Sequence, residues 1–168
     1  MKSKYPSTKI FSLFLLSSFF FLSCLSAKDS KPSNFVILSG ESSKIVFQQC
    51  SRPSVTKVEK LWTPTENQIA SFEKALENFV KDKSFLDYNK QYAGFIREGK
   101  KYIYLNALKN YKNDDTWKKQ ASVVCDGGQS FFGAEYEVEK NAIIHFNCNG
   151  SIAAPGISSA PEDCYRLP

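Results

Sequence analysis

The stretch from residue 123 to residue 138 constrains the fold most, because it joins two β-patterned runs through a pair of glycines. The motif Asp126-Gly127-Gly128-Gln129 separates residues 120–125 from residues 130–138. A glycine pair between two such runs is typical of a tight hairpin turn. The sequence therefore predicts two antiparallel strands here, with Asp126 opposite Gln129.

A second hairpin is predicted between residues 91–97 and residues 100–108, which are separated by Glu98-Gly99. If residue 97 faces residue 100, alternate side chains divide into an aliphatic face and an aromatic face with polar tips. The aliphatic face then holds Tyr92, Gly94, Ile96, Ile103 and Leu105, and the aromatic face holds Phe95, Tyr102, Tyr104 and Asn106.

The last predicted strand covers residues 142–148 and follows Glu139-Lys140-Asn141. A three-residue loop with Asn141 in the left-handed region would set residue 138 opposite residue 142. That register places Glu135 opposite His145 on the face away from the core. The core face then holds Phe132, Ala134, Tyr136, Val138, Ile144, Phe146 and Cys148.

Thr63-Pro64-Thr65-Glu66 predicts the start of a helix, with Thr63 as the cap, Pro64 in the first turn and Glu66 completing a capping box. Apolar residues at helical spacing carry the helix to about Lys83. The predicted fold class is α+β, with one long helix packed on an antiparallel meander of about five strands. In outline this is similar to cystatin-like or nuclear-transport-factor-like folds. The apolar stripe of the helix comprises Ile69, Phe72, Leu76, Phe79 and Val80.

Residues 1–24 are typical of a signal peptide, because basic residues precede an apolar run too short to span a bilayer. Phe21-Leu22-Ser23-Cys24 is similar to a lipobox, which predicts lipidation of Cys24 and anchoring to the membrane. Cleavage after Ala27 is the alternative and would release a soluble protein. We expect residues 25–42 to be a tether and residues 43–168 to form a single domain with an irregular tail from residue 149. Both alternatives predict the bacterial cell envelope, with the protein lipid-anchored, periplasmic or secreted.

Composition excludes several classes of function. Three of the 22 basic residues, Lys2, Lys4 and Lys9, lie in the expected leader, so the rest of the chain is nearly balanced against its 17 acidic residues. Such balance does not favour nucleic acid as a partner. With 1 His in the chain, a metal site is not expected, and no cofactor is predicted.

The four cysteines other than Cys24 are Cys50, Cys125, Cys148 and Cys164, an even number that predicts two disulfides with three possible connectivities. In the predicted sheet, Cys125 and Cys148 lie on strands separated by a central strand, roughly 10 Å apart at ~4.8 Å per strand step. A disulfide cannot span that distance. This favours Cys50–Cys125 with Cys148–Cys164.

Several motifs follow one another between about residues 48 and 140. They are Gln49-Cys50-Ser51-Arg52, Trp62-Thr63-Pro64, Gln91-Tyr92-Ala93-Gly94-Phe95-Ile96, and the runs at residues 123–132 and 133–136. Together they resemble a family of short uncharacterised exported bacterial proteins. The resemblance implies export and a pairing of Cys50 with Cys125, and it implies no activity. Cys148 and Cys164 are additions to the family pattern.

The aromatic face is the candidate binding surface, comprising Phe95, Tyr102, Tyr104 and Phe131 with His145 beside it. Tyrosine-rich faces stack on sugar rings or form protein interfaces. We therefore predict a small non-enzymatic binding or interaction module with an envelope protein or a glycan as its partner. The alternative for this face is burial under the N-terminal segment or the tail.

Two other functions remain open. Glu135 and His145 are the acid and base of a possible envelope hydrolase, but no positioned nucleophile accompanies them. A surface ion pair would need no function. The other possibility is a purely structural lipoprotein, which would expose no apolar face.

Overall fold

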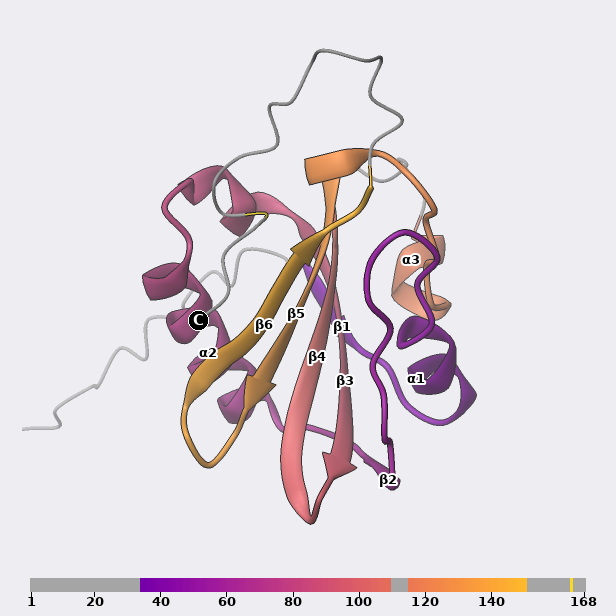
Figure 1. Ribbon diagram of the computed structural model, residues 1–168, viewed down its shortest axis with the longest axis vertical. Helices are drawn as coiled ribbons and strands as arrows, with labels where there is room; N and C mark the ends of the chain where they lie inside the picture. Colours follow the sequence, from indigo (N-terminus) through magenta and orange to yellow (C-terminus); the bar gives the residue numbers. More distant parts are fainter. Residues whose placement is uncertain (1–33, 110–114, 151–163, 165–168) are drawn as a thin grey trace, which may run out of the picture. The chain divides into compact units, whose positions relative to one another are not determined.

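The computed structural model describes residues 34–109, 115–150 and 164, which form an α+β fold (Figure 1). The described residues contain three α-helices, two short 3-10 helices and a six-stranded mixed sheet. In chain order the elements are β1 (Phe35–Ile37), α1 (Glu41–Val46), β2 (Lys60–Trp62), α2 (Glu66–Phe79), η1 (Lys83–Asp87), β3 (Asn89–Arg97), β4 (Lys100–Leu108), α3 (Thr116–Lys119), η2 (Gly128–Ser130), β5 (Phe131–Glu137) and β6 (Ala142–Cys148).

The sheet has the order β1-β3-β4-β5-β6, and β2 pairs with the second half of β3. Strands β3 to β6 form an antiparallel meander, as predicted, but β1 is parallel to β3 and makes the sheet mixed. Because β1 includes residues 35–37, the prediction of a tether over residues 25–42 was wrong for its last part. The expected leader, Cys24 and most of the tail lie outside the described residues.

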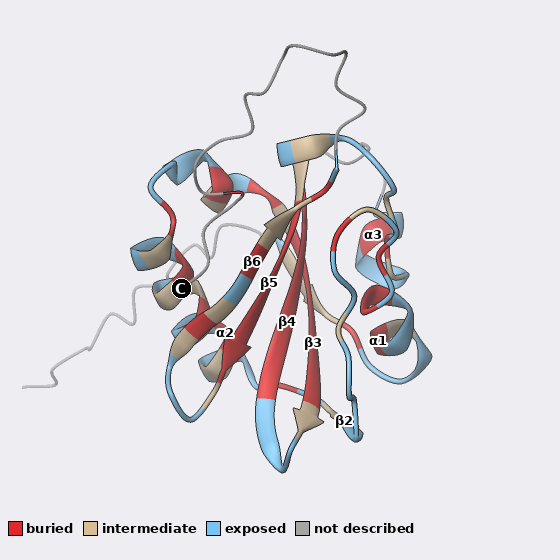
Figure 2. Cartoon of the chain, viewed as in Figure 1, coloured by how far each residue is buried: buried red, intermediate tan, exposed pale blue. Residues whose placement is uncertain are grey.

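The β3–β4 hairpin has the predicted register, with Arg97 opposite Lys100. Its aliphatic face meets α2, where Phe72 packs edge-on against Tyr92 at 5.4 Å and stacks on Tyr136 at 4.9 Å between ring centroids. Ile69 and Leu76 are buried on the same side of the helix, as the apolar stripe predicts. This layer between α2 and the sheet is the main core (Figure 2).

Helix α2 begins two residues later than predicted. Its N-cap is Thr65, whose side chain accepts a hydrogen bond from the backbone of Gln68 while the Gln68 side chain accepts one from the backbone of Thr65. Glutamate and glutamine can both complete a capping box. The prediction paired Glu66 with Thr63, whereas in the structure Gln68 pairs with Thr65. The helix ends at Phe79, because Val80 is already extended.

The predicted strand at residues 120–125 is absent, and β5 pairs directly with β4, with Ala134 opposite Leu105. Side chains of the sheet satisfy the backbone of this segment instead of a strand ladder. Asn106 donates to the carbonyl oxygen of Ser122 at 2.9 Å, and the backbone N–H of Ser122 donates to Gln91 at 2.9 Å. The glycine pair at residues 127–128 leads into η2 and not into a hairpin.

The β5–β6 pair confirms that Glu135 lies opposite His145, and Asn141 has the predicted left-handed φ of 53°. A register shift then follows between Glu135 and Tyr136, so Glu137 lies opposite Ala142 and the predicted pairing of residue 138 with residue 142 was wrong. As a result Ile143 enters the main core, while Ile144 packs against the aromatic cluster on the other face. The prediction that Ile144 faces the main core was therefore wrong, since a bulge reverses the alternation of side chains.

Both predicted disulfides are present. Cys50 and Cys125 have Cα atoms 4.9 Å apart, and Cys148 and Cys164 have Cα atoms 5.1 Å apart. The pairing is confirmed, although Cys125 does not lie on a strand as the argument for the pairing assumed. Two disulfides are typical of proteins that reside in an oxidising compartment outside the cytoplasm. Within the described ranges, no helix is long and apolar enough to cross a membrane.

Buried tyrosines predict a loss of stability at alkaline pH. Burial, with a smaller effect of Asp82, raises the pKa of Tyr88 to about 12, and burial next to Glu73 raises that of Tyr92 well above its usual value. Below the unfolded pKa of about 10, both phenols are protonated in the folded and the unfolded state, and their contribution to stability is fully present. Above it the unfolded chain ionises first, so the urea midpoint should fall as the pH rises from about 10 towards about 12. The prediction would be contradicted if the tyrosinate absorbance of the folded protein rose completely at pH ~10, as it does for exposed tyrosines.

Candidate binding site

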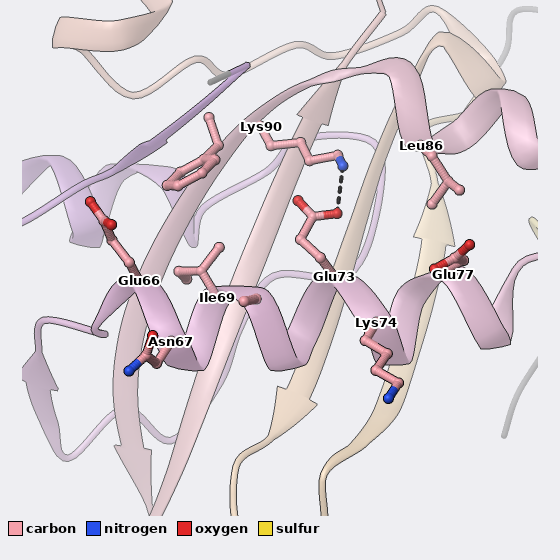
Figure 3. Close-up of a pocket in the computed structure, with 10 residues that line it drawn as sticks. Glu66, Asn67, Ile69, Glu73, Lys74, Glu77, Leu86 and Lys90 are labelled. Atoms are coloured by element: carbon pink, nitrogen blue, oxygen red, sulfur yellow. Dashed lines mark hydrogen bonds and ion pairs between the residues drawn. The ribbon is translucent and has the colours of Figure 1, made fainter. Parts of the chain in front are cut away.

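A cavity of about 850 Å³ follows α2 on the main-core side of the sheet (Figure 3). Lys90 and Glu73 point toward each other across it, with 2.7 Å between Nζ and Oε2. The Tyr92 hydroxyl donates to the other oxygen of Glu73 at 2.5 Å. The most buried charges of this α2 groove therefore neutralise each other, and they connect the helix to β3.

A second cavity, of about 330 Å³, lies on the opposite face of the sheet, and we call it the cleft. It opens between residues 52–56 and the strands β3, β4, β5 and β6. Its volume is at the lower end of the range for small-molecule sites. Its lining residues are Arg52, Pro53, Ser54, Thr56, Arg97, Tyr104, Gly133, Ala134, Glu135, His145 and Asn147.

The segment that carries Arg52 is held in place over the aromatic face. Phe47 packs edge-on against Phe95 and Tyr104, with ring centroids 5.3 and 5.9 Å apart. The disulfide from Cys50 to Cys125 ties the segment to the chain after α3. The backbone N–H of Gly150 donates to the carbonyl oxygen of Ser51 at 2.9 Å. These contacts leave the backbone next to Arg52 little freedom.

Arg52 is 7% exposed, and its hydrogen bonds go to neutral oxygens. Its Nε donates to the Tyr104 hydroxyl at 3.1 Å, Nη1 donates to Asn149 Oδ1, and Nη2 donates to Asn106 Oδ1. A guanidinium has five N–H groups. Among the described residues, one N–H on each terminal nitrogen of Arg52 therefore has no acceptor, and the guanidinium has no carboxylate partner.

Gly133 makes room for the contact between Arg52 and Tyr104. A Cβ atom at this position would lie 2.6 Å from the Tyr104 hydroxyl oxygen and 2.8 Å from Arg52 Nε. Neither group can retreat easily, because both are buried. The close approach of β5 to the guanidinium thus requires glycine at this position of the strand.

The other guanidinium of the cleft, Arg97, is already neutralised. Its Nη2 lies 2.6 Å from Glu135 Oε2, and its Cζ lies 4.4 Å from the centroid of the Tyr102 ring. Burial lowers the pKa of Arg97, but Glu135 and the Tyr102 hydroxyl outweigh this effect and raise it above its usual value. Arg97 and Glu135 therefore form a charged ion pair at one side of the cleft.

Tyr104 presents a neutral hydroxyl to the cleft. Burial raises the pKa of its phenol, an effect that Arg52 partly offsets and Glu135 reinforces. Because the hydroxyl oxygen accepts a hydrogen bond from Arg52, its own hydrogen is available to a further acceptor.

The prediction of an exposed aromatic binding face was wrong. Phe95, Tyr102 and Tyr104 are 0%, 6% and 3% exposed, because the N-terminal segment with α1 and Phe47 covers them. This is the alternative that the sequence left open. Tyr104 lines the cleft, and Phe131 lies outside it, half-buried beside Gly127. Among the predicted binding residues, His145 is exposed and lines the cleft.

Sequence reasoning missed Arg52 and Arg97 as site residues. The signal available for Arg52 was its place two residues after Cys50, since a disulfide positions the residues beside it. Glu135 and His145 are opposite each other as predicted, but Glu135 accepts a hydrogen bond from Arg97. In the part of the chain that the structure describes, no hydrogen bond or ion pair joins Glu135 to His145.

No group of three His, Cys, Asp or Glu side chains among residues 34–109, 115–150 and 164 could hold a metal ion. Comparison with family models, curated proteins and solved structures gives no match for this chain. The resemblance of its motifs to an exported bacterial family therefore stays a prediction.

Proposed function

We propose that the protein is a small exported binding module of the bacterial cell envelope, which holds its ligand in the cleft and does not transform it. The observation that carries the proposal is Arg52, a nearly buried cation that lines a cavity and, among the described residues, has no carboxylate partner. Export is supported by the signal-like residues 1–24 and by the two disulfides. The fold outline we propose is the cystatin-like or nuclear-transport-factor-like one.

The cleft supports a binding role better than the aromatic face and the α2 groove do. The aromatic face is buried, and the most buried charges of the α2 groove are already paired with each other. In the cleft, by contrast, His145 and Asn147 have side chains without hydrogen-bond partners among the described residues, next to the unneutralised Arg52. Such a convergence of polar groups in a concave site is typical of ligand binding.

A hydrolase is less well supported by the same geometry. The carboxylate of Glu135 is held by Arg97 at 2.6 Å, so it does not orient the imidazole of His145. Ser54 and Thr56 contribute hydroxyls to the opposite wall, but no hydrogen bond joins either of them to His145 among the described residues, and Ser54 donates its hydrogen to the carbonyl oxygen of Gln49 at 3.2 Å. This arrangement lacks an activated nucleophile.

A fragment screen by nuclear magnetic resonance tests the proposal on the full chain. We expect amide signals of the cleft, at residues 52–56, 133–135 and 145–147, to shift with the bound fragments. Asn147→Ala should weaken the binding of these fragments, whereas Lys74→Ala in the α2 groove should leave their binding unchanged. Hits confined to the α2 groove, or no hits on the cleft, would contradict the proposal.

Anchoring to the membrane is the second part of the proposal and has a separate measurement. Intact-mass analysis of the protein from the membrane fraction should find a diacylglyceryl group on Cys24 as the new N-terminal residue. A soluble species that begins after Ala27 would instead make the protein periplasmic or secreted. In either case the protein would remain a module of the envelope.

A further inference from the structure

We infer that the group recognised in the cleft is a carboxylate, and that Arg52 provides its counter-charge. This inference rests on the proposed function, since it names the ligand chemistry of the same site. It goes further than that function by selecting one class of ligand among the small molecules that a cavity of about 330 Å³ could hold.

The charge balance of the cleft is the first argument. Its lining contains two guanidinium groups and one carboxylate, and that carboxylate is paired with Arg97. Arg52 is left with three neutral oxygen acceptors, although it is 7% exposed. A buried cation without a counter-ion is costly, because the protein interior replaces little of its hydration. An anionic ligand would remove this cost.

Lys90, which is buried, and Arg97, which is half-buried, provide the contrast. Lys90, which is 3% exposed, has Glu73 at 2.7 Å, and the side chain of Arg97, which is 15% exposed, has Glu135 at 2.6 Å. Both therefore have the carboxylate that Arg52 lacks. These two cations follow the usual rule that buried charges are paired. Arg52 is the exception, and it lies at the wall of a cavity.

The number of free donors favours a carboxylate over a phosphate. Arg52 has one free N–H on each terminal nitrogen, and the hydrogen of the Tyr104 hydroxyl adds a third donor. One guanidinium neutralises one negative charge, and a planar pair of oxygens suits its planar fork. A phosphate dianion would need a second cation, but Arg97 is held by Glu135. A neutral sugar would leave the charge of Arg52 unbalanced.

A carboxylate can come from a peptide C-terminus or from an acidic sugar, and matched probes separate these sources. We suggest calorimetric titration of the full chain with N-acetylglycine and its amide, with glucuronic acid and glucose, and with inorganic phosphate. We expect one of the two acids to bind about 10- to 100-fold more tightly than its neutral partner, because hydrogen bonds to charged groups are stronger than neutral ones. Phosphate should bind less tightly than that acid.

Variants assign the preference to named groups. Arg52→Gln should abolish the preference for the acid. Tyr104→Phe keeps the buried ring, and it should weaken binding of the acid several-fold while it changes the affinity for the neutral partner little. Lys74→Ala is the control outside the cleft and should change neither. Thermal unfolding of each variant shows whether it is folded. If Arg52→Gln does not fold, Tyr104→Phe and the comparison of acid with neutral probe on the unaltered chain still decide.

The outcomes separate the two levels of the argument. Equal affinity for acid and neutral probe, with signals of the cleft shifted by both, would overturn the carboxylate inference and leave the binding function standing. Tighter binding of phosphate than of either acid would also overturn it. No binding of any probe in the cleft, together with no cleft hits in the fragment screen, would overturn both.

Discussion

Replacing Cys50 and Cys125 together by serine is expected to lower the free energy of unfolding by about 4 kcal/mol. The two cysteines are 75 residues apart in the chain, so their bond removes much of the conformational freedom of the unfolded state. Both residues are exposed, so the substitution leaves no cavity in the core. The loss should therefore come mainly from the unfolded chain and from release of the segment that carries Phe47 and Arg52.

Urea denaturation of the oxidised protein and of the double variant measures this effect. We expect the variant also to lose order in the cluster of Phe47, Phe95 and Tyr104, because the segment over the aromatic face is no longer tied to residue 125. The aromatic resonances of the folded variant report on that cluster. A loss below about 1 kcal/mol with unchanged aromatic resonances would show that packing and hydrogen bonds hold the segment without the disulfide.

The substitution Glu73→Gln is expected to cost about 3 to 5 kcal/mol of stability, because it leaves a buried ammonium group without its carboxylate. Lys90 is 3% exposed, and its Nζ lies 2.7 Å from Glu73. The same carboxylate accepts a hydrogen bond from the Tyr92 hydroxyl. Glu73 thus holds α2 to residues 90 and 92 on one face of β3, and its charge is the part that glutamine cannot replace.

A double-mutant cycle separates the charge from the packing. Lys90→Met combined with Glu73→Gln should recover most of the loss, because no unpaired charge then remains. Glu77→Gln is the matched control, since Glu77 is exposed one turn further along α2, and it should change stability by less than about 0.5 kcal/mol. Equal losses for Glu73→Gln and for the double variant would mean that the burial of the ammonium is not the cause.

Several features of the fold could be predicted from the sequence because they depend on neighbours in the chain. The spacing of Ile69, Phe72 and Leu76 identifies the buried side of α2. The turn at Glu98-Gly99 sets the register of β3 and β4, and the alternation of side chains then separates the two faces. These inferences use the periods of helix and strand, which any chain of this pattern must follow.

Other local patterns were misleading because tertiary contacts outweighed them. The apolar run at the end of residues 120–125 predicted a strand, but Gln91 and Asn106 bind the backbone of this segment from the face of the sheet. The bulge beside Glu135 is equally hidden, since it needs one extra residue on β6 and has no distinct sequence signal. In both places a hydrogen-bond partner that is distant in sequence decides the conformation.

By itself, the sequence determined the α+β class, the α2 stripe, the β3–β4 hairpin and the position of Glu135 opposite His145. The disulfide pairing agreed with the prediction, although the strand at Cys125 on which that prediction depended is absent. The tertiary structure alone decided that the aromatic face is covered and that Arg52 lines a cleft. Arg52 meets Tyr104, Asn106 and Asn149 across separations of 52, 54 and 97 residues. Periodicity and turn chemistry act over a few residues, whereas a charge buried without a counter-ion becomes visible only when all the segments around it are in place.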